Sequence, residues 1–119
     1  MDRKELQNRT KKFHVDVIKL CESFPRNAAG FETAKQLIRS AGSVGANYGA
    51  SARAKSNADF IYKIQIVLEE ADESLYWLEV VNDAELIFAN DLKKLITEAD
   101  ELTAIFAAAE KTVSSKKTD

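Results

Sequence analysis

Apolar residues recur at helical spacing in four stretches of the chain, with polar residues between them. In the first stretch the apolar positions lie three, four or seven residues apart: Leu6, Phe13, Val17, Leu20 and Phe24. Pro25 follows directly, and a proline disfavours helical backbone at the residue before it. We therefore predict a helix over residues 3–24.

A second apolar stretch, over residues 31–54, contains three glycines at helical spacing: Gly42, Gly45 and Gly49. Each glycine costs an exposed helix about 1 kcal/mol relative to alanine, so local propensity favours a break. The spacing nevertheless places all three on one side, where missing side chains let a neighbouring helix come close. We predict a continuous helix that packs tightly through this small-residue segment. Asn47 lies within it, and we expect its amide to bond to a facing helix and to fix the register.

The third stretch predicts a helix over residues 58–82, with Ser56 as its N-cap and Asp59 as the acidic member of a capping box. One face carries a core-type set: Phe60, Ile64, Val67, Leu68, Ala71, Leu75 and Leu78. A second apolar set lies away from it: Tyr62, Ile66, Trp77, Val80 and Val81. Because a helix with two apolar sides needs two partners, we expect the second side, including Trp77, to lie at a subunit interface.

The fourth stretch predicts a helix over residues 91–113, with Asn90 as its cap. Its apolar positions form a seam with spacings of three and four: Leu92, Leu95, Ala99, Leu102, Phe106, Ala109 and Val113. Helices of similar length joined by short connections place neighbours antiparallel. The sequence thus predicts an all-α protein, an antiparallel up-down-up-down four-helix bundle, as a single domain over residues 1–119.

The composition is that of a globular helical protein. Of 119 residues, 45% are hydrophobic and 30% charged, and four Gly and one Pro are too few for the turns of an all-β chain. No stretch approaches the roughly 18 apolar residues of a membrane span, and the N-terminus has no apolar signal region. Together with the single cysteine, these features lead us to expect a cytoplasmic protein.

The net charge of −2 conceals two oppositely charged halves. Residues 1–56 contain 11 Lys or Arg and 5 Asp or Glu, whereas residues 57–119 contain 6 and 14. A basic half is typical of binding to nucleic-acid phosphates, but complementary helices within a bundle or between subunits produce the same asymmetry. If nucleic acid is bound, these residues are the candidates for binding it: Arg9, Lys11, Lys12, Lys19, Arg39, Arg53 and Lys55.

The sequence contains no pattern typical of a catalytic, metal or cofactor site. A di-iron bundle needs Glu-x-x-His on two helices, and His14 is the single histidine. His14 and Cys21 lie seven residues apart, too far to share a metal ion or to form a nucleophile and base pair. The segment Gly42–Gly49 lacks the Gly-Lys-Ser/Thr ending of a phosphate loop. We therefore expect no catalytic residues, no metal, no cofactor and no small-molecule substrate.

Three segments in the middle of the chain resemble one known family. The first runs from Gln36 to Tyr48 and reads Gln-Leu-Ile-Arg-Ser-Ala-Gly-Ser-Val-Gly-Ala-Asn-Tyr. The others are Arg-Ala-Lys-Ser with Asp-Phe-Ile, within 53–61, and Glu-Glu-Ala-Asp-Glu with Tyr-Trp-Leu-Glu, within 69–79. Together they resemble the four helix bundle protein family, also called the 23S rRNA intervening-sequence proteins.

The resemblance implies a homopentameric ring of bundles with no established enzymatic activity. It also implies a relationship to the accessory variability protein of diversity-generating retroelements, which binds nucleic acid through basic surfaces and contacts a reverse transcriptase. Two hypotheses follow. The first is a non-enzymatic homo-oligomer that binds structured RNA or DNA. The second is a protein-interaction scaffold or accessory subunit that binds no nucleic acid.

Overall fold

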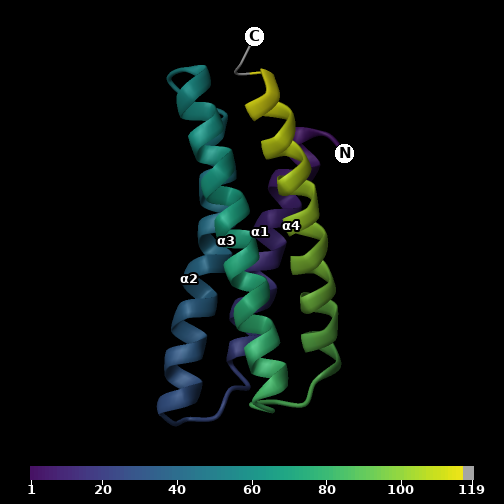
Figure 1. Ribbon diagram of the computed structural model, residues 1–119. Helices are drawn as coiled ribbons and strands as arrows, with labels where there is room; N and C mark the ends of the chain where they lie inside the picture. The colour runs from purple at the N-terminus through teal and green to yellow at the C-terminus, as the bar shows by residue number, and fades with distance from the viewer. Residues whose placement is uncertain (117–119) are drawn as a thin grey trace.

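The computed structural model describes residues 1–116 and contains four helices: α1 (Arg3–Cys21), α2 (Ala28–Ser51), α3 (Asn57–Asp83) and α4 (Asn90–Lys116). They run alternately in opposite directions along one elongated bundle of 50 × 23 × 21 Å (Figure 1). Each helix packs against two neighbours, so α1 and α3 occupy opposite corners, as do α2 and α4. The predicted antiparallel four-helix bundle is confirmed.

Side-chain caps decide where α2 and α3 begin. The Gly30 N–H donates to Asn27 Oδ1 at 2.9 Å, so α2 begins at Ala28 rather than at residue 31. Ser56 caps α3 as predicted, because its Oγ accepts a hydrogen bond of 3.1 Å from the Asp59 N–H. Both helix starts therefore follow from local hydrogen bonds.

The capping box of α3 differs in detail from the prediction. The Asp59 carboxylate accepts a bond of 2.9 Å from the Lys55 N–H rather than from the N–H of the cap residue. It also accepts a bond of 2.8 Å from the ammonium group of Lys63, one turn later. These two bonds, the Lys63 bond foremost, hold the pKa of Asp59 below its usual value of 3.8.

The remaining helix ends also depart from the expected residues. α1 stops at Cys21 rather than at residue 24, and the next three N–H groups bond to carbonyls three residues back. Phe24 lies beyond the helix but is only 7% exposed, so it still belongs to the core. α2 ends at Ser51, before residue 54. α4 begins at Asn90 itself and continues to Lys116 instead of ending at residue 113.

The turn after α3 holds Glu85 in left-handed backbone, with a φ of 54°. The Glu85 N–H bonds to the Asn82 carbonyl and the Leu86 N–H to the Val81 carbonyl, both at 3.1 Å. These paired bonds form a Schellman motif, whose left-handed residue is most often glycine because a Cβ disfavours positive φ. Leu86 is half-buried against the core and leads the chain toward α4.

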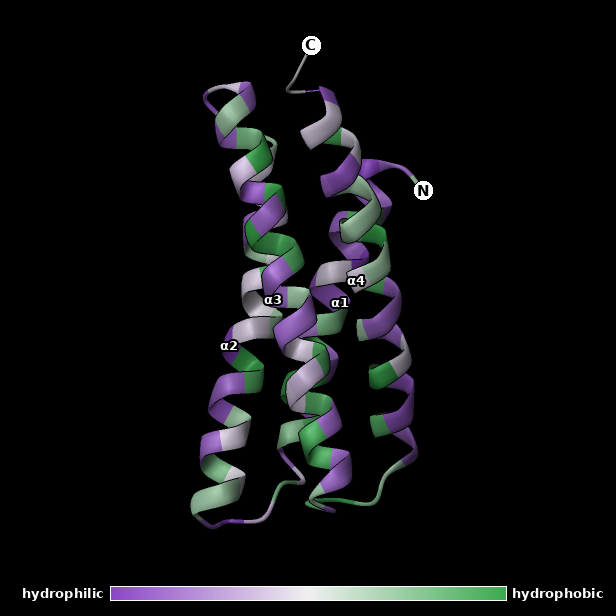
Figure 2. Cartoon of the chain, in the orientation of Figure 1, coloured by the Kyte–Doolittle hydropathy of each residue, from purple (hydrophilic) through white to green (hydrophobic). Residues whose placement is uncertain are grey.

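One hydrophobic core runs along the bundle, and hydrophobic and hydrophilic positions alternate along every helix (Figure 2). The core face of α3 consists of Ile61, Ile64, Val67, Ala71, Ser74, Leu78 and Val81. It shares Ile64, Val67, Ala71 and Leu78 with the first predicted face, which is therefore confirmed in the main. Phe60, Leu68 and Leu75 are only half-buried, and Val81, which we expected at a subunit interface, is fully buried. The other members of both sets, apart from the exposed Tyr62, lie on the flanks of this face because α3 packs against α2 on one side and α4 on the other.

Candidate nucleic-acid interface

The three glycines of the small-residue segment differ in how closely α1 approaches them. A Cβ at Gly42 would lie 2.9 Å from the Cε1 and Nε2 atoms of His14. A Cβ at Gly45 would lie 3.5 Å from Thr10, which is ordinary van der Waals contact, and one at Gly49 would meet nothing within 4 Å. The expected close approach of the α1 backbone is therefore found at Gly45, where the nearest atom is the Thr10 carbonyl carbon. The His14 ring fills the space beside Gly42, and the approach does not extend to Gly49.

A fourth glycine, which the helical pattern did not single out, is packed most tightly. A Cβ at Gly30 would lie 1.9 Å from the carbonyl oxygen of Pro25 and 2.9 Å from its carbonyl carbon. The connection between α1 and α2 thus folds back over the first turn of α2. Pro25, Asn27 and Gly30 together carry the local signal for this turn: a proline, a cap residue and a residue without a side chain.

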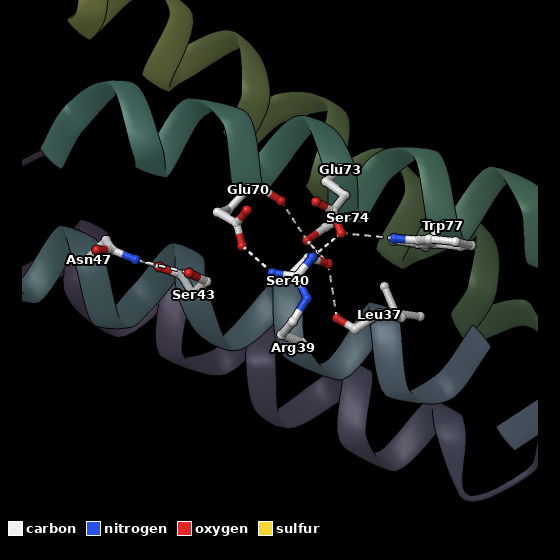
Figure 3. Close-up of polar contacts among 9 residues, drawn as sticks. All are labelled: Leu37, Arg39, Ser40, Ser43, Asn47, Glu70, Glu73, Ser74 and Trp77. Carbon is white, nitrogen blue, oxygen red and sulfur yellow. Dashed lines mark hydrogen bonds and ion pairs between the residues drawn. The ribbon is translucent and has the colours of Figure 1, made fainter. Parts of the chain in front are cut away.

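Asn47 bonds within α2 rather than to a facing helix. Its Nδ2 lies 2.9 Å from both the carbonyl oxygen and the Oγ of Ser43, one turn earlier (Figure 3). A half-buried amide that is satisfied inside its own helix places no constraint on the register between helices. The expectation that Asn47 fixes the register is therefore corrected.

Two buried serines join α2 to α3 instead. The Oγ atoms of Ser40 and Ser74 lie 2.9 Å apart, and neither residue is exposed (Figure 3). Backbone carbonyls of Leu37, at 3.2 Å, and Glu70, at 2.8 Å, satisfy the same hydroxyls. A sliding of one helix along the other would break the hydroxyl pair, whereas apolar contacts can re-form in a new register. This pair is thus a buried directional contact between α2 and α3.

Arg39 is bound to the acidic run of α3. Its guanidinium donates to Glu70 Oε2 at 2.9 Å and also pairs with Glu73 (Figure 3). The hydrogen bond to Glu73, followed by the charges of both carboxylates, raises the pKa of Arg39. Glu73 also accepts a hydrogen bond of 3.0 Å from Trp77 Nε1. The half-buried Trp77 therefore belongs to the polar seam between α2 and α3.

Arg9 is paired in the same way with α4. Its Nε and Nη2 donate to the two carboxylate oxygens of Glu98 at 2.7 and 2.6 Å, and Nη2 also lies 2.9 Å from Glu101. The hydrogen bonds to Glu98 raise the pKa of Arg9. Lys12 pairs with Asp16, one turn along α1. Including Arg39, three of the seven basic candidates face carboxylates of their own chain.

The other four candidates are exposed and form no ion pair with residues 1–116. Lys11 lies on the outward side of α1, and Lys19 lines a groove between α1 and α4. Arg53 and Lys55 follow α2, at the end of the bundle where the N-terminus lies (Figure 1). The structure does not bring the seven candidates together into one basic surface.

Arg3, which was not among the seven candidates, connects the start of α1 to the end of α2. Its guanidinium carbon lies 4.6 Å from the centre of the Tyr48 ring, a cation–π contact. Its Nη2 donates to the Tyr48 carbonyl at 2.8 Å and to Ser51 Oγ at 3.0 Å. The Nε atom of Arg3 is buried and has no hydrogen-bond partner within residues 1–116. No local pattern predicts this contact, because its members lie more than 40 residues apart in sequence.

Within residues 1–116, no three His, Cys, Asp or Glu side chains are grouped as a metal site requires. Burial raises the pKa of the Cys21 thiol to about 11, so the thiol stays protonated near neutral pH and is a poor nucleophile.

No helix within residues 1–116 is long and apolar enough to cross a membrane.

The family model of the 23S rRNA-intervening sequence protein matches residues 3–108. The chain belongs to this family. The match to the 23S rRNA-intervening sequence family covers α1, α2 and α3 entirely and most of α4, so the resemblance seen in the sequence is confirmed.

A solved structure is also similar: the crystal structure of a protein of unknown function from the S23 ribosomal protein family of Bacteroides thetaiotaomicron. It is 30% identical, with a TM-score of 0.82 over 93% of this chain and 99% of that one. No curated protein matches the chain. Family and fold are thereby established.

Proposed function

We propose that the protein is a non-enzymatic bundle that assembles with copies of itself and uses its unpaired basic residues to bind nucleic acid. The observation that carries the proposal is the separation of charge between opposite corners of the bundle. Exposed side chains of α1 include Lys4, Lys11 and Lys19, whereas those of α3 include Glu69, Asp72, Glu79 and Asp83. Faces of opposite charge on one molecule attract each other between copies.

Both charged faces also expose apolar or aromatic side chains. On α1, Val15 is 40% exposed and Ile18 39% exposed. On α3, Tyr62 is 60% exposed and Tyr76 57% exposed. Aromatic and apolar side chains bordered by polar ones are typical of protein interfaces. A contact between two different faces is head-to-tail, and such contacts close into a ring when the rotation between copies permits. A ring of five, as the family resemblance implies, is the specific form of this proposal.

Light scattering coupled to size-exclusion chromatography tests the assembly. We expect a molar mass near five times the 13.2 kDa of one chain in low salt. Because complementary charges are screened at high ionic strength, we expect the assembly to weaken in 1 M salt. A species of one chain at all concentrations in low salt would contradict the proposed assembly.

The nucleic-acid part of the proposal is supported by the end of the bundle that holds the N-terminus. Arg53 and Lys55 are exposed there, as are Lys4 near the start of α1 and Lys111 near the end of α4 (Figure 1). Without carboxylate partners among the described residues, these side chains are available to phosphates.

Binding to structured RNA and duplex DNA, measured by fluorescence anisotropy during a salt titration, tests this part. The slope of log affinity against log salt changes by about 0.9 for each phosphate contact on duplex DNA. We expect the double change Arg53→Ala with Lys55→Ala to weaken binding and to flatten the slope. Lys35→Ala removes an exposed lysine near the start of α2 and is the matched control. Absence of binding at low salt would leave the second hypothesis, a protein-interaction scaffold.

A further inference from the structure

A groove of about 660 Å³ separates α1 from α4 along the half of the bundle distant from the N-terminus. Among the neighbouring pairs of helices, α1 and α4 pack least closely, which leaves room for the groove. Its floor is apolar and consists of the buried Phe13, Leu20 and Leu95, with the exposed Ala89 at one end. Its charged edges come from both helices.

The positive side chains that line the groove have fewer close ion-pair partners than its carboxylates have. Asp16 pairs with Lys12 on the α1 side, and Glu98 pairs with Arg9. Lys19 forms no ion pair among the described residues, and Lys94 reaches Asp91 only at 4.0 Å, with both side chains 79% exposed. The groove thus combines an apolar floor with two available positive charges, one on each helix.

The outward side of α3, the helix diagonally opposite α1, has the complementary features. We call it the ridge, and it carries Asp72, Tyr76 and Glu79. Tyr76 projects from this ridge with 57% of its surface exposed, although one edge of its ring packs on Trp77 at 5.1 Å between centroids. Asp72 and Glu79 lie one turn before and one turn after it and are exposed. No residue among 1–116 forms an ion pair with either of these two carboxylates.

Ridge and groove lie at the same height along the bundle. His14 of α1 is level with Gly42 of α2, because a Cβ there would touch its ring. Two residues away on α2, Ser40 is level with Ser74 of α3. Since each helical residue rises about 1.5 Å, Tyr76 lies level with the part of α1 between Asp16 and Lys19, which is the middle of the groove.

We infer that Tyr76 of one copy inserts into the α1–α4 groove of the next copy, with Glu79 between Lys19 and Lys94. The inference rests on the proposed self-assembly and names its interface. Because groove and ridge lie at equal height on different sides of the bundle, successive copies stand parallel and side by side. The contact is head-to-tail, so every copy uses one ridge and one groove.

Two kinds of variant disable the two halves of the contact separately. Tyr76→Ala removes the inserted ring, and Lys19→Glu with Lys94→Glu reverses the charge of the groove. Phe31→Ala is the matched control, because this aromatic side chain is 61% exposed on α2, outside both the ridge of α3 and the residues that line the groove. Circular dichroism verifies that each variant is folded.

Sedimentation velocity gives the assembly state and its concentration dependence. We expect Tyr76→Ala and the double lysine variant to dissociate at concentrations at least tenfold above those at which the wild type does, and Phe31→Ala to differ less than twofold. Adding Glu79→Lys to the double lysine variant should restore assembly, since the charges are then exchanged. Equal assembly of the wild type, Tyr76→Ala and the double lysine variant would overturn this interface.

Mixing the two variants tests the head-to-tail geometry directly. The Tyr76→Ala chain retains an intact groove, and the double lysine variant retains an intact ridge. We expect a 1:1 complex of two chains that grows no further, because the other ridge and groove are both disabled. Failure to form this complex, while the wild type assembles, would overturn the interface and leave self-assembly intact. A wild type that stays monomeric would instead refute the proposed assembly itself.

Discussion

The changes Gly30→Ala and Gly49→Ala are chemically identical but should have opposite effects on stability. A Cβ at Gly30 would lie 1.9 Å from the Pro25 carbonyl oxygen, so the α1–α2 connection must move by about 1 Å or more. Overpacking of this kind costs about 1 to 3 kcal/mol. The movement also strains the bond from the Gly30 N–H to Asn27, a cap worth about 1 kcal/mol. We therefore expect Gly30→Ala to lower the free energy of unfolding by about 2 to 4 kcal/mol.

At Gly49 a Cβ would meet nothing within 4 Å, so only helix propensity changes. Alanine is favoured over glycine by about 1 kcal/mol inside a helix, and by less in the last turn, where Gly49 lies. We expect Gly49→Ala to raise the free energy of unfolding by about 0.5 kcal/mol. The two variants should then differ by about 3 kcal/mol, or roughly 12 °C in melting temperature for a chain of this size.

Urea denaturation followed by circular dichroism at 222 nm measures both changes. All proteins are compared at one concentration, because self-association raises the apparent stability of the folded state. If Gly30→Ala were as stable as the wild type, the close contact with Pro25 would not exist in solution. If Gly49→Ala lowered the free energy of unfolding by more than about 1 kcal/mol, the space beside Gly49 would not be open in solution.

Three further predictions concern single residues. Glu85→Gly should raise the free energy of unfolding by about 1 kcal/mol in urea denaturation, because glycine removes the strain of positive φ at the end of α3; an unchanged midpoint would contradict the Schellman geometry. Cys21 should react with a thiol reagent at pH 8 about 100-fold more slowly in the folded than in the unfolded protein, because burial raises its pKa to about 11. Fast reaction in the native state would show that the thiol is accessible. Asp59→Asn should destabilise the protein at neutral pH, because a carboxylate whose pKa is lowered on folding stabilises the folded state while it is ionised. The difference in stability from the wild type should therefore disappear as the pH falls below 3.8. A difference in denaturation curves that does not depend on pH would point to a steric cause.

The hydrogen-bond partner of Asn47, which differs from the expected one, illustrates which polar contacts a sequence reveals. An amide among small residues was expected to bond across to another helix, but Ser43 lies one turn away and satisfies it first. Local partners within a helix are close before the helices pack, so they compete with distant ones. The serine pair that does cross between helices, Ser40 and Ser74, shows no sequence signal because serine is common on helix surfaces.

The basic candidates illustrate the same limit for charge. The charge count of the two halves indicated either a nucleic-acid surface or complementary helices. The structure shows both charge patterns on different residues: Arg9 and Arg39 are paired with α4 and α3, whereas Arg53 and Lys55 are exposed at the end of the bundle. Whether a side chain is paired depends on the helix that lies opposite it, which a count along the chain does not contain.

The sequence by itself determined the number of helices, the cap at Ser56 and the core positions of α4, from Leu92 to Phe106. These features depend on interactions over a few residues, namely helical periodicity and hydrogen bonds to nearby N–H groups. The sequence also placed Ile64, Val67, Ala71 and Leu78 on the core face of α3. Only the tertiary structure decided that Ile61, Ser74 and Val81 complete this face, because it is shared between α2 and α4. It also decided that Gly42 and Gly30 are closely packed while Gly49 is not. How closely each glycine is packed depends on the group that lies against it: the Pro25 backbone at Gly30, the His14 ring at Gly42 and nothing within 4 Å at Gly49. The spacing of glycines along one helix carries no information about these neighbours.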